Sequence, residues 1–146
     1  MKKLGIIAVL FFMTCGIACA KDNYGFIDLP YIMSKYNVAV SVNRNVKQRE
    51  SEIQKLLNDA NKRLAATKDE NAKKSIEEAA KKQIQPKLDS LAAYQKQQNS
   101  KIEASLTAAV SKVAKNGNYA LILNGNSVAF GAVNVSDLVL RELNQR

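Results

Sequence analysis

The residues of this chain that are best suited to do chemistry are its cations. Lysines stand in adjacent pairs at 73–74 and 81–82 and are followed by Lys87. Between Arg44 and Lys115 the chain has sixteen basic and nine acidic residues, a net charge of +7. Such an excess raises the local concentration of anions, although lysine pairs of this kind also occur on solvated helix faces. We predict that an acidic partner contacts the following residues: Lys73, Lys74, Lys81, Lys82 and Lys87.

Catalytic chemistry has few candidates after residue 20. The sequence has no histidine, and both cysteines lie within the first twenty residues, which excludes Cys- or His-based nucleophilic and zinc chemistry in the remainder. Asp28 has no accompanying carboxylate or histidine, so we interpret it as a strand-end polar residue or a helix cap. The glycines at 117, 125 and 131 are spaced for turns and do not form a phosphate loop. We expect no enzyme, no cofactor and no metal.

The first twenty residues have the three-part pattern of a secretory signal peptide. Lys2 and Lys3 form a basic start, residues 4–17 are uncharged and apolar, and Ala18-Cys19-Ala20 supplies a small-residue cleavage site. The apolar run is shorter than the ~20 residues that span a bilayer, which argues against a membrane anchor. In a lipoprotein Cys19 would carry the lipid, but the residues before it lack the leucine usual in such signals. We expect cleavage after Ala20.

Cleavage of this signal predicts an exported protein. A basic excess often indicates nucleic acid, but an exported protein meets little of it, so we expect no nucleic-acid partner. Acidic protein clients or anionic lipid headgroups are the favoured partners of the basic segment.

The middle of the chain reads as a long helical segment. No glycine occurs between residues 25 and 117, and Ala, Lys, Glu, Gln and Leu dominate the composition. Apolar residues recur at steps of three, four and seven, which is typical of a thin coiled-coil seam. We predict a projecting antiparallel helical hairpin over residues 38–116, exposed on most of its circumference.

The tip of this hairpin has two candidate positions. Polar residues interrupt the seam at 67–75, where Asp69 or Asn71 could cap a second helix. Pro86 is the rival, because proline ends or kinks a helix. Apolar spacing resumes on both sides of Pro86, so we predict the tip at 67–75 and a kink, acting as a hinge, at Pro86.

Short β-prone segments lie on both sides of the helical region. Residues 24–29 read as a strand, and Pro30 then suits the first turn of a short helix. Residues 119–132 read as a β-hairpin, because Asn124 and Gly125 supply the residue types of a tight turn. We predict that the N-terminal strand and this C-terminal hairpin form one sheet at the base of the helices.

The predicted body, residues 21–37 and 117–146, is too small to stand alone. It has about fifty residues, near the size below which domains need disulfides, metals or oligomerisation. Its strands are apolar on both faces, which implies burial on both. We therefore predict an α+β fold, a small sheet body carrying the helical arm, that oligomerises through its strands. The expected interface residues are Ile27, Leu29, Leu121, Leu123, Val128 and Phe130.

Four features of this sequence occur together in one protein family. They are the export signal, the segment "YGFIDLPYIMSKY", the basic Ala/Lys/Gln-rich helices, and "YALILNGNSVAFG" followed by "VSDLVLREL". It is the Skp/OmpH family of periplasmic chaperones, which this sequence resembles over essentially the whole chain after residue 20. The resemblance implies a homotrimer, in which three sheets form a common body and three helical arms surround a cavity. It further implies that unfolded outer-membrane β-barrel proteins are held there without ATP.

Two questions of function stay open at this point. The basic arms also favour anionic lipid or lipopolysaccharide at the membrane surface as a further partner. A structural coiled-coil protein of the envelope, which spaces or anchors other components and binds no client, is the alternative function.

Overall fold

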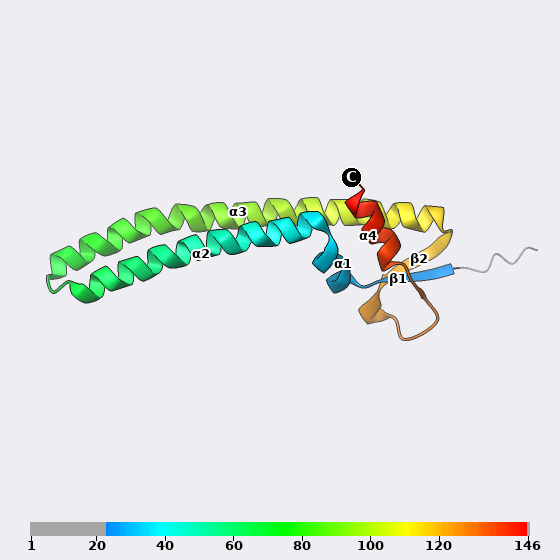
Figure 1. Cartoon of the computed structure of the whole chain (residues 1–146), viewed down its shortest axis with the longest axis horizontal. Helices are drawn as coiled ribbons and strands as arrows, with labels where there is room; N and C mark the ends of the chain where they lie inside the picture. The colour runs from blue at the N-terminus through cyan, green and yellow to red at the C-terminus, as the bar shows by residue number, and fades with distance from the viewer. Residues whose placement is uncertain (1–22, 146) are drawn as a thin grey trace, which may run out of the picture.

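The structure, a computed structural model, describes residues 23–145. The predicted signal peptide and its cleavage site after Ala20 lie outside these residues. Within them the chain has two parts, a long helical arm and a small body at its base (Figure 1). No helix in this described part is long and apolar enough to cross a membrane.

Two antiparallel helices form the arm. α2 spans Asn37–Ala66 and α3 spans Glu70–Asn116, so at about 1.5 Å per residue they are about 45 and 70 Å long. Figure 1 shows them bowing together, with the C-terminal part of α3 running alongside the body. Few side chains are buried along these helices, and they follow the predicted seam: Ile53, Ala60, Ile84, Leu91, Ile102, Ala109 and Val113.

The tip of the arm lies at residues 67–69, where α2 has ended and α3 has not begun. Asp69 caps α3, because its Oδ2 accepts a hydrogen bond from the backbone N–H of Ala72 at 2.9 Å. The predicted tip position within 67–75 is therefore confirmed. The rival tip at Pro86 is wrong, since α3 continues through that residue.

The body contains a three-stranded sheet in which both strand pairings are parallel. β1 (Asn23–Ile27) lies in the middle, between β2 (Tyr119–Asn124) and β3 (Val133–Asn134). Parallel strands need a long crossover connection. The whole helical arm is the connection from β1 to β2, which explains why strands so far apart in sequence are neighbours.

The predicted C-terminal β-hairpin is wrong, because β2 and β3 pair with opposite edges of β1. Asn124 keeps an extended backbone, and its Oδ1 accepts a hydrogen bond from the backbone N–H of Asn126 at 3.3 Å. The chain then enters a short 3-10 helix at Gly125–Ser127 instead of a tight hairpin turn. Residues 127–130, predicted as the returning strand, are consequently not a strand.

The hydrophobic core lies between the sheet, α1 (Leu29–Lys35), α4 (Ser136–Asn144) and the base of α3. Asp28 caps α1 by accepting a hydrogen bond from the N–H of Tyr31 at 2.9 Å, and its own N–H donates to Ser136 Oγ at 2.8 Å. The interpretation of Asp28 as a helix cap is confirmed. The side chains with almost no exposure are Ile32, Ala109, Val135 and Val139.

Candidate functional site

The five lysines predicted to contact an acidic partner all lie in the N-terminal half of α3, four of them towards the tip of the arm and Lys87 about midway along it. Successive residues of a helix point about 100° apart, so these lysines are distributed around α3 and do not converge on one point. Lys74, Lys81 and Lys82 are exposed, and the ion pairs found within residues 23–145 do not include them. They supply a diffuse positive surface that is suited to attraction of an anionic chain from a distance.

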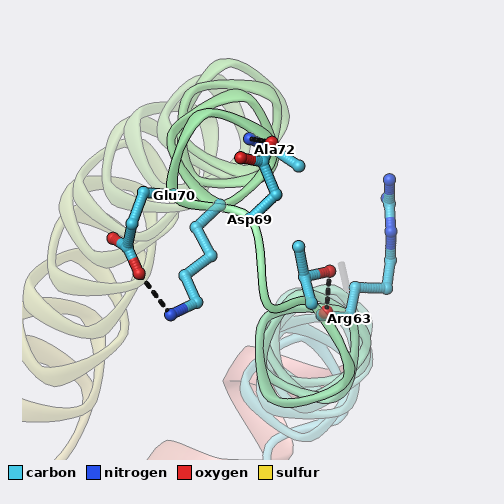
Figure 2. A network of polar contacts seen from close by, with 6 residues as sticks. Arg63, Asp69, Glu70 and Ala72 are labelled. Atoms are coloured by element: carbon cyan, nitrogen blue, oxygen red, sulfur yellow. Dashed lines mark hydrogen bonds and ion pairs between the residues drawn. The ribbon is translucent and has the colours of Figure 1, made fainter.

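Lys73 differs from these three because it forms an ion pair with a residue of its own helix. Its Nζ lies 2.6 Å from Glu70 Oε1, one turn earlier, next to the Asp69 cap at the start of α3 (Figure 2). On the facing end of α2, the backbone oxygen of Arg63 accepts a hydrogen bond from Thr67 Oγ1 at 2.7 Å. Both helix ends at the tip are therefore capped by local side chains, and part of the charge of Lys73 is neutralised.

Polar side chains join α2 and α3 about midway along the arm. The guanidinium carbon of Arg49 lies 4.7 Å from the centroid of the Tyr94 ring, and Arg49 Nη1 donates to Ser90 Oγ at 3.5 Å. Beside them, Lys87 Nζ lies 3.8 Å from Glu52 Oε2. These contacts connect the two helices at this level.

A small cavity of about 190 Å³ lies among these side chains, and we call it the mid-arm pocket. Next to it, a small apolar cluster of Ile53, Ile84 and Leu91 connects the two helices. The pocket is therefore cationic and polar at its rim and apolar at its base. Its lining residues are Arg49, Glu52, Ile53, Pro86, Lys87 and Ser90.

The sequence predicted Lys87 and Pro86 within the arm, but it did not predict the contact between Arg49 and Tyr94. One signal was present, because Tyr94 is the only aromatic residue between Tyr36 and Tyr119. Its partner lies 45 residues earlier on the other helix, so it could be found only once the register of the hairpin was known.

A larger groove of about 610 Å³ lies at the root of the arm, between α1, α2 and α3. Met33, Val42 and Val46 give it an apolar surface, while Asn43 and Asn99 add side-chain amides. Methionine adapts its shape to different apolar neighbours. This groove thus offers modest apolar contact close to the body.

One face of the sheet is apolar and partly open to solvent. Side chains alternate along a strand, and Ile27 points into the core, so Tyr24 and Phe26 point to the other face. The register pairs Tyr24 with Leu121 and Phe26 with Leu123, which extends this face across β2. Tyr24 is 45% exposed and Leu121 is 48% exposed. We call these four residues the outer sheet face.

The six residues predicted at a subunit interface fall into two groups. Ile27 is 8% exposed and lies in the core of its own chain, and Leu29 packs against that core. Leu121 and Leu123 belong to the outer sheet face, while Phe130 is 98% exposed on the loop after β2. Val128, on the same loop, is half-buried. The second group is therefore available to another chain, whereas Ile27 supports the sheet from inside.

The described part of the chain contains no cluster of side chains suited to bind a metal ion. Within residues 23–145 no group of three His, Cys, Asp or Glu side chains could hold a metal ion. The described surface instead presents exposed lysines, a polar pocket and exposed apolar side chains.

Comparison with known protein families identifies the family to which this chain belongs. Residues 23–143 match the family described as Outer membrane protein (OmpH-like), so the chain belongs to that family. The resemblance to the Skp/OmpH family is thereby confirmed. A search of curated protein sequences found no match.

The fold is also similar to that of a solved structure. A crystal structure from Caulobacter crescentus CB15, of a protein named as an OmpH-like outer membrane chaperone, aligns with a TM-score of 0.54 and 16% sequence identity. The alignment covers 87% of this chain and 86% of the other. At this identity the likeness shows a shared fold.

Proposed function

We propose that this protein is an ATP-independent holdase chaperone of the periplasm, exported by a signal that is cleaved after Ala20. It binds unfolded outer-membrane β-barrel proteins and prevents their aggregation. Membership of the OmpH-like family, and a fold shared with a protein named as an outer membrane chaperone, support a chaperone role rather than an enzymatic one. The observation that carries the proposal is the arm itself, a long basic projection with unpaired lysines and little buried surface.

The proposed binding is electrostatic at first and partly apolar afterwards. One exposed charge pair contributes only about 1 kcal/mol at 4 Å in water. Many such interactions together draw in an acidic chain quickly and hold it loosely, so it can be released. The groove at the root of the arm supplies apolar contact that persists at high salt. Anionic lipid or lipopolysaccharide at the membrane surface is the second proposed partner of the same lysines.

The proposed assembly is a homotrimer held by the body, residues 21–37 and 117–146, with arms over residues 38–116. Tyr24 and Leu121 lie on the outer sheet face and Phe130 lies on the adjoining loop, and all three expose large apolar areas. Exposed apolar side chains, where they gather into a patch, mark interaction sites. Packing the sheets of three chains against one another would cover these side chains and would place three arms around one cavity.

An aggregation assay tests the proposed function. An outer-membrane β-barrel protein, unfolded in urea, is diluted into buffer without ATP, and light scattering is followed with and without an equimolar amount of assembled protein. We expect the scattering to be suppressed. Unchanged scattering would contradict the holdase role and favour the structural envelope protein, which needs no client binding.

A further inference from the structure

The mid-arm pocket brings cations from both helices of the arm to one place. Arg49 reaches it from α2, and Lys87 comes from α3 together with the hydroxyl of Ser90. Only Glu52 among the lining residues is acidic, and its Oε2 is 3.8 Å from Lys87 Nζ, beyond hydrogen-bond length. One cation of the pocket is therefore left without a counter-charge.

Arg49 is that cation, and contacts with Tyr94 and Ser90 orient its side chain. Within residues 23–145 it makes no ion pair; it stacks on the ring of Tyr94 at 4.7 Å and donates to Ser90 Oγ at 3.5 Å. Stacking on an aromatic ring orients a guanidinium without using its N–H groups. Arginine has five such donors in a planar fork, so most of them remain free.

The shape of the pocket limits what this fork can receive. A volume of about 190 Å³ suits one small group. Ile53 and Pro86 provide apolar surface beside the cations, which suits a methylene segment next to the charge. A guanidinium fork matches the two oxygens of a carboxylate in bidentate geometry. These properties together describe the side chain of an aspartate or glutamate.

We propose that the mid-arm pocket is a carboxylate-binding subsite, which receives acidic side chains of the bound client polypeptide. The inference rests on the proposed function and deepens it. The exposed lysines of α3 nearer the tip of the arm attract an acidic chain without fixing it, whereas Arg49 binds individual carboxylates at a defined position. Tyr94 acts as a positioning residue for Arg49.

The test compares two arginines of α2 that carry the same charge. Arg49→Gln removes the cation of the pocket, and Arg44→Gln removes an exposed cation outside it. Affinity for a fluorescently labelled, unfolded β-barrel protein is measured by anisotropy at low salt with the assembled protein. A partly exposed charge pair corresponds to about a threefold rise in Kd for Arg49→Gln. We expect less than half of that effect for Arg44→Gln.

Further variants separate recognition from structure. Arg49→Lys keeps the charge but loses the fork, so its Kd should lie between those of wild type and Arg49→Gln. Tyr94→Leu keeps an apolar side chain and should also weaken binding, while circular dichroism shows unchanged helix content. Amidation of the client carboxylates should abolish the difference between Arg49→Gln and wild type.

The outcomes are distinguishable. Equal effects of Arg49→Gln and Arg44→Gln, or a difference that survives amidation of the client, would overturn the subsite while leaving the holdase function intact. An effect of Arg49→Gln confined to binding of phosphatidylglycerol vesicles would also overturn it, since the pocket would then recognise phosphate. Failure of the wild-type protein to bind the unfolded client would instead reject the proposed function.

Discussion

Reversing the charge of lysines on α3 should slow the capture of an unfolded client. The arm segment from Arg44 to Lys115 carries a net charge of +7, and replacing Lys73, Lys74, Lys81 and Lys82 with glutamate changes it to −1. Electrostatic steering accelerates association by roughly 10- to 1,000-fold. We therefore expect association with an acidic client to slow by about tenfold or more at low salt when the sign of the arm is reversed.

The structure sharpens this test. Lys73 is paired with Glu70 at 2.6 Å, and a glutamate at position 73 would place two carboxylates one turn apart, at a cost of roughly 0.2–0.5 kcal/mol. Reversing only Lys74, Lys81 and Lys82 lowers the arm charge from +7 to +1, and it places the new glutamates one turn from Glu70, Glu77 and Glu78, at a similar cost for each pair. The three-residue variant should therefore show most of the effect on the association rate, with a small loss of helix content that circular dichroism measures.

Stopped-flow fluorescence of a labelled, unfolded β-barrel protein gives the association rate. Raising the salt concentration from about 0.05 to 0.5 M shortens the screening length about threefold. The association rate of wild type should then fall towards the rates of the variants. Replacement of the same lysines with glutamine is the matched control and should have an intermediate effect. Association rates indifferent to both salt and charge reversal would refute the steering mechanism and leave the lysines as a solubilising surface.

Three other changes test separate parts of the account. Leu123→Asp would place a carboxylate on the outer sheet face, which destabilises the assembly by several kcal/mol if a neighbouring chain covers this face. Sedimentation should then show dissociated chains. An intact trimer would contradict the proposed interface. Pro86→Ala should restore one backbone hydrogen bond in α3, raise the helix content measured by circular dichroism and narrow the range of client sizes accepted; an unchanged range would argue against a hinge. Asp69→Ala removes the bond to the N–H of Ala72 at 2.9 Å and should lower the stability of the first turn of α3 by about 1 kcal/mol. Hydrogen exchange of residues 70–73 should accelerate, and unaltered exchange would show that the cap is not needed.

The arm could be predicted from sequence because its signals are local. Helix propensity, seam spacing and the polar break at 67–75 are properties of nearby residues, and they placed the tip correctly and included Asp69 as one of two candidate caps. The same holds for Asp28, whose side chain accepts a hydrogen bond only three residues away. The distant origin of the partner strand was also inferred correctly, because β1 and β2 pair across the arm.

The order of the strands could not be predicted from local signals. Asn124 and Gly125 have the composition of a tight turn, but the second edge of β1 competes for the returning chain and pairs with β3. That competition involves residues more than one hundred positions apart. The site shows the same division, since the lysines of α3 were apparent as a group, whereas the contact between Arg49 and Tyr94 depends on the register of two helices.

Site-specific photo-crosslinking tests the central claim most directly, namely that the arms hold the client. A photoreactive residue replaces Lys82, which is exposed on α3, or Arg141, which is exposed on α4 in the body. Each protein is mixed with an unfolded outer-membrane β-barrel protein and irradiated. The account predicts strong crosslinking from position 82 and little from position 141. Equal yields from both positions, or none from position 82 while aggregation is suppressed, would contradict it.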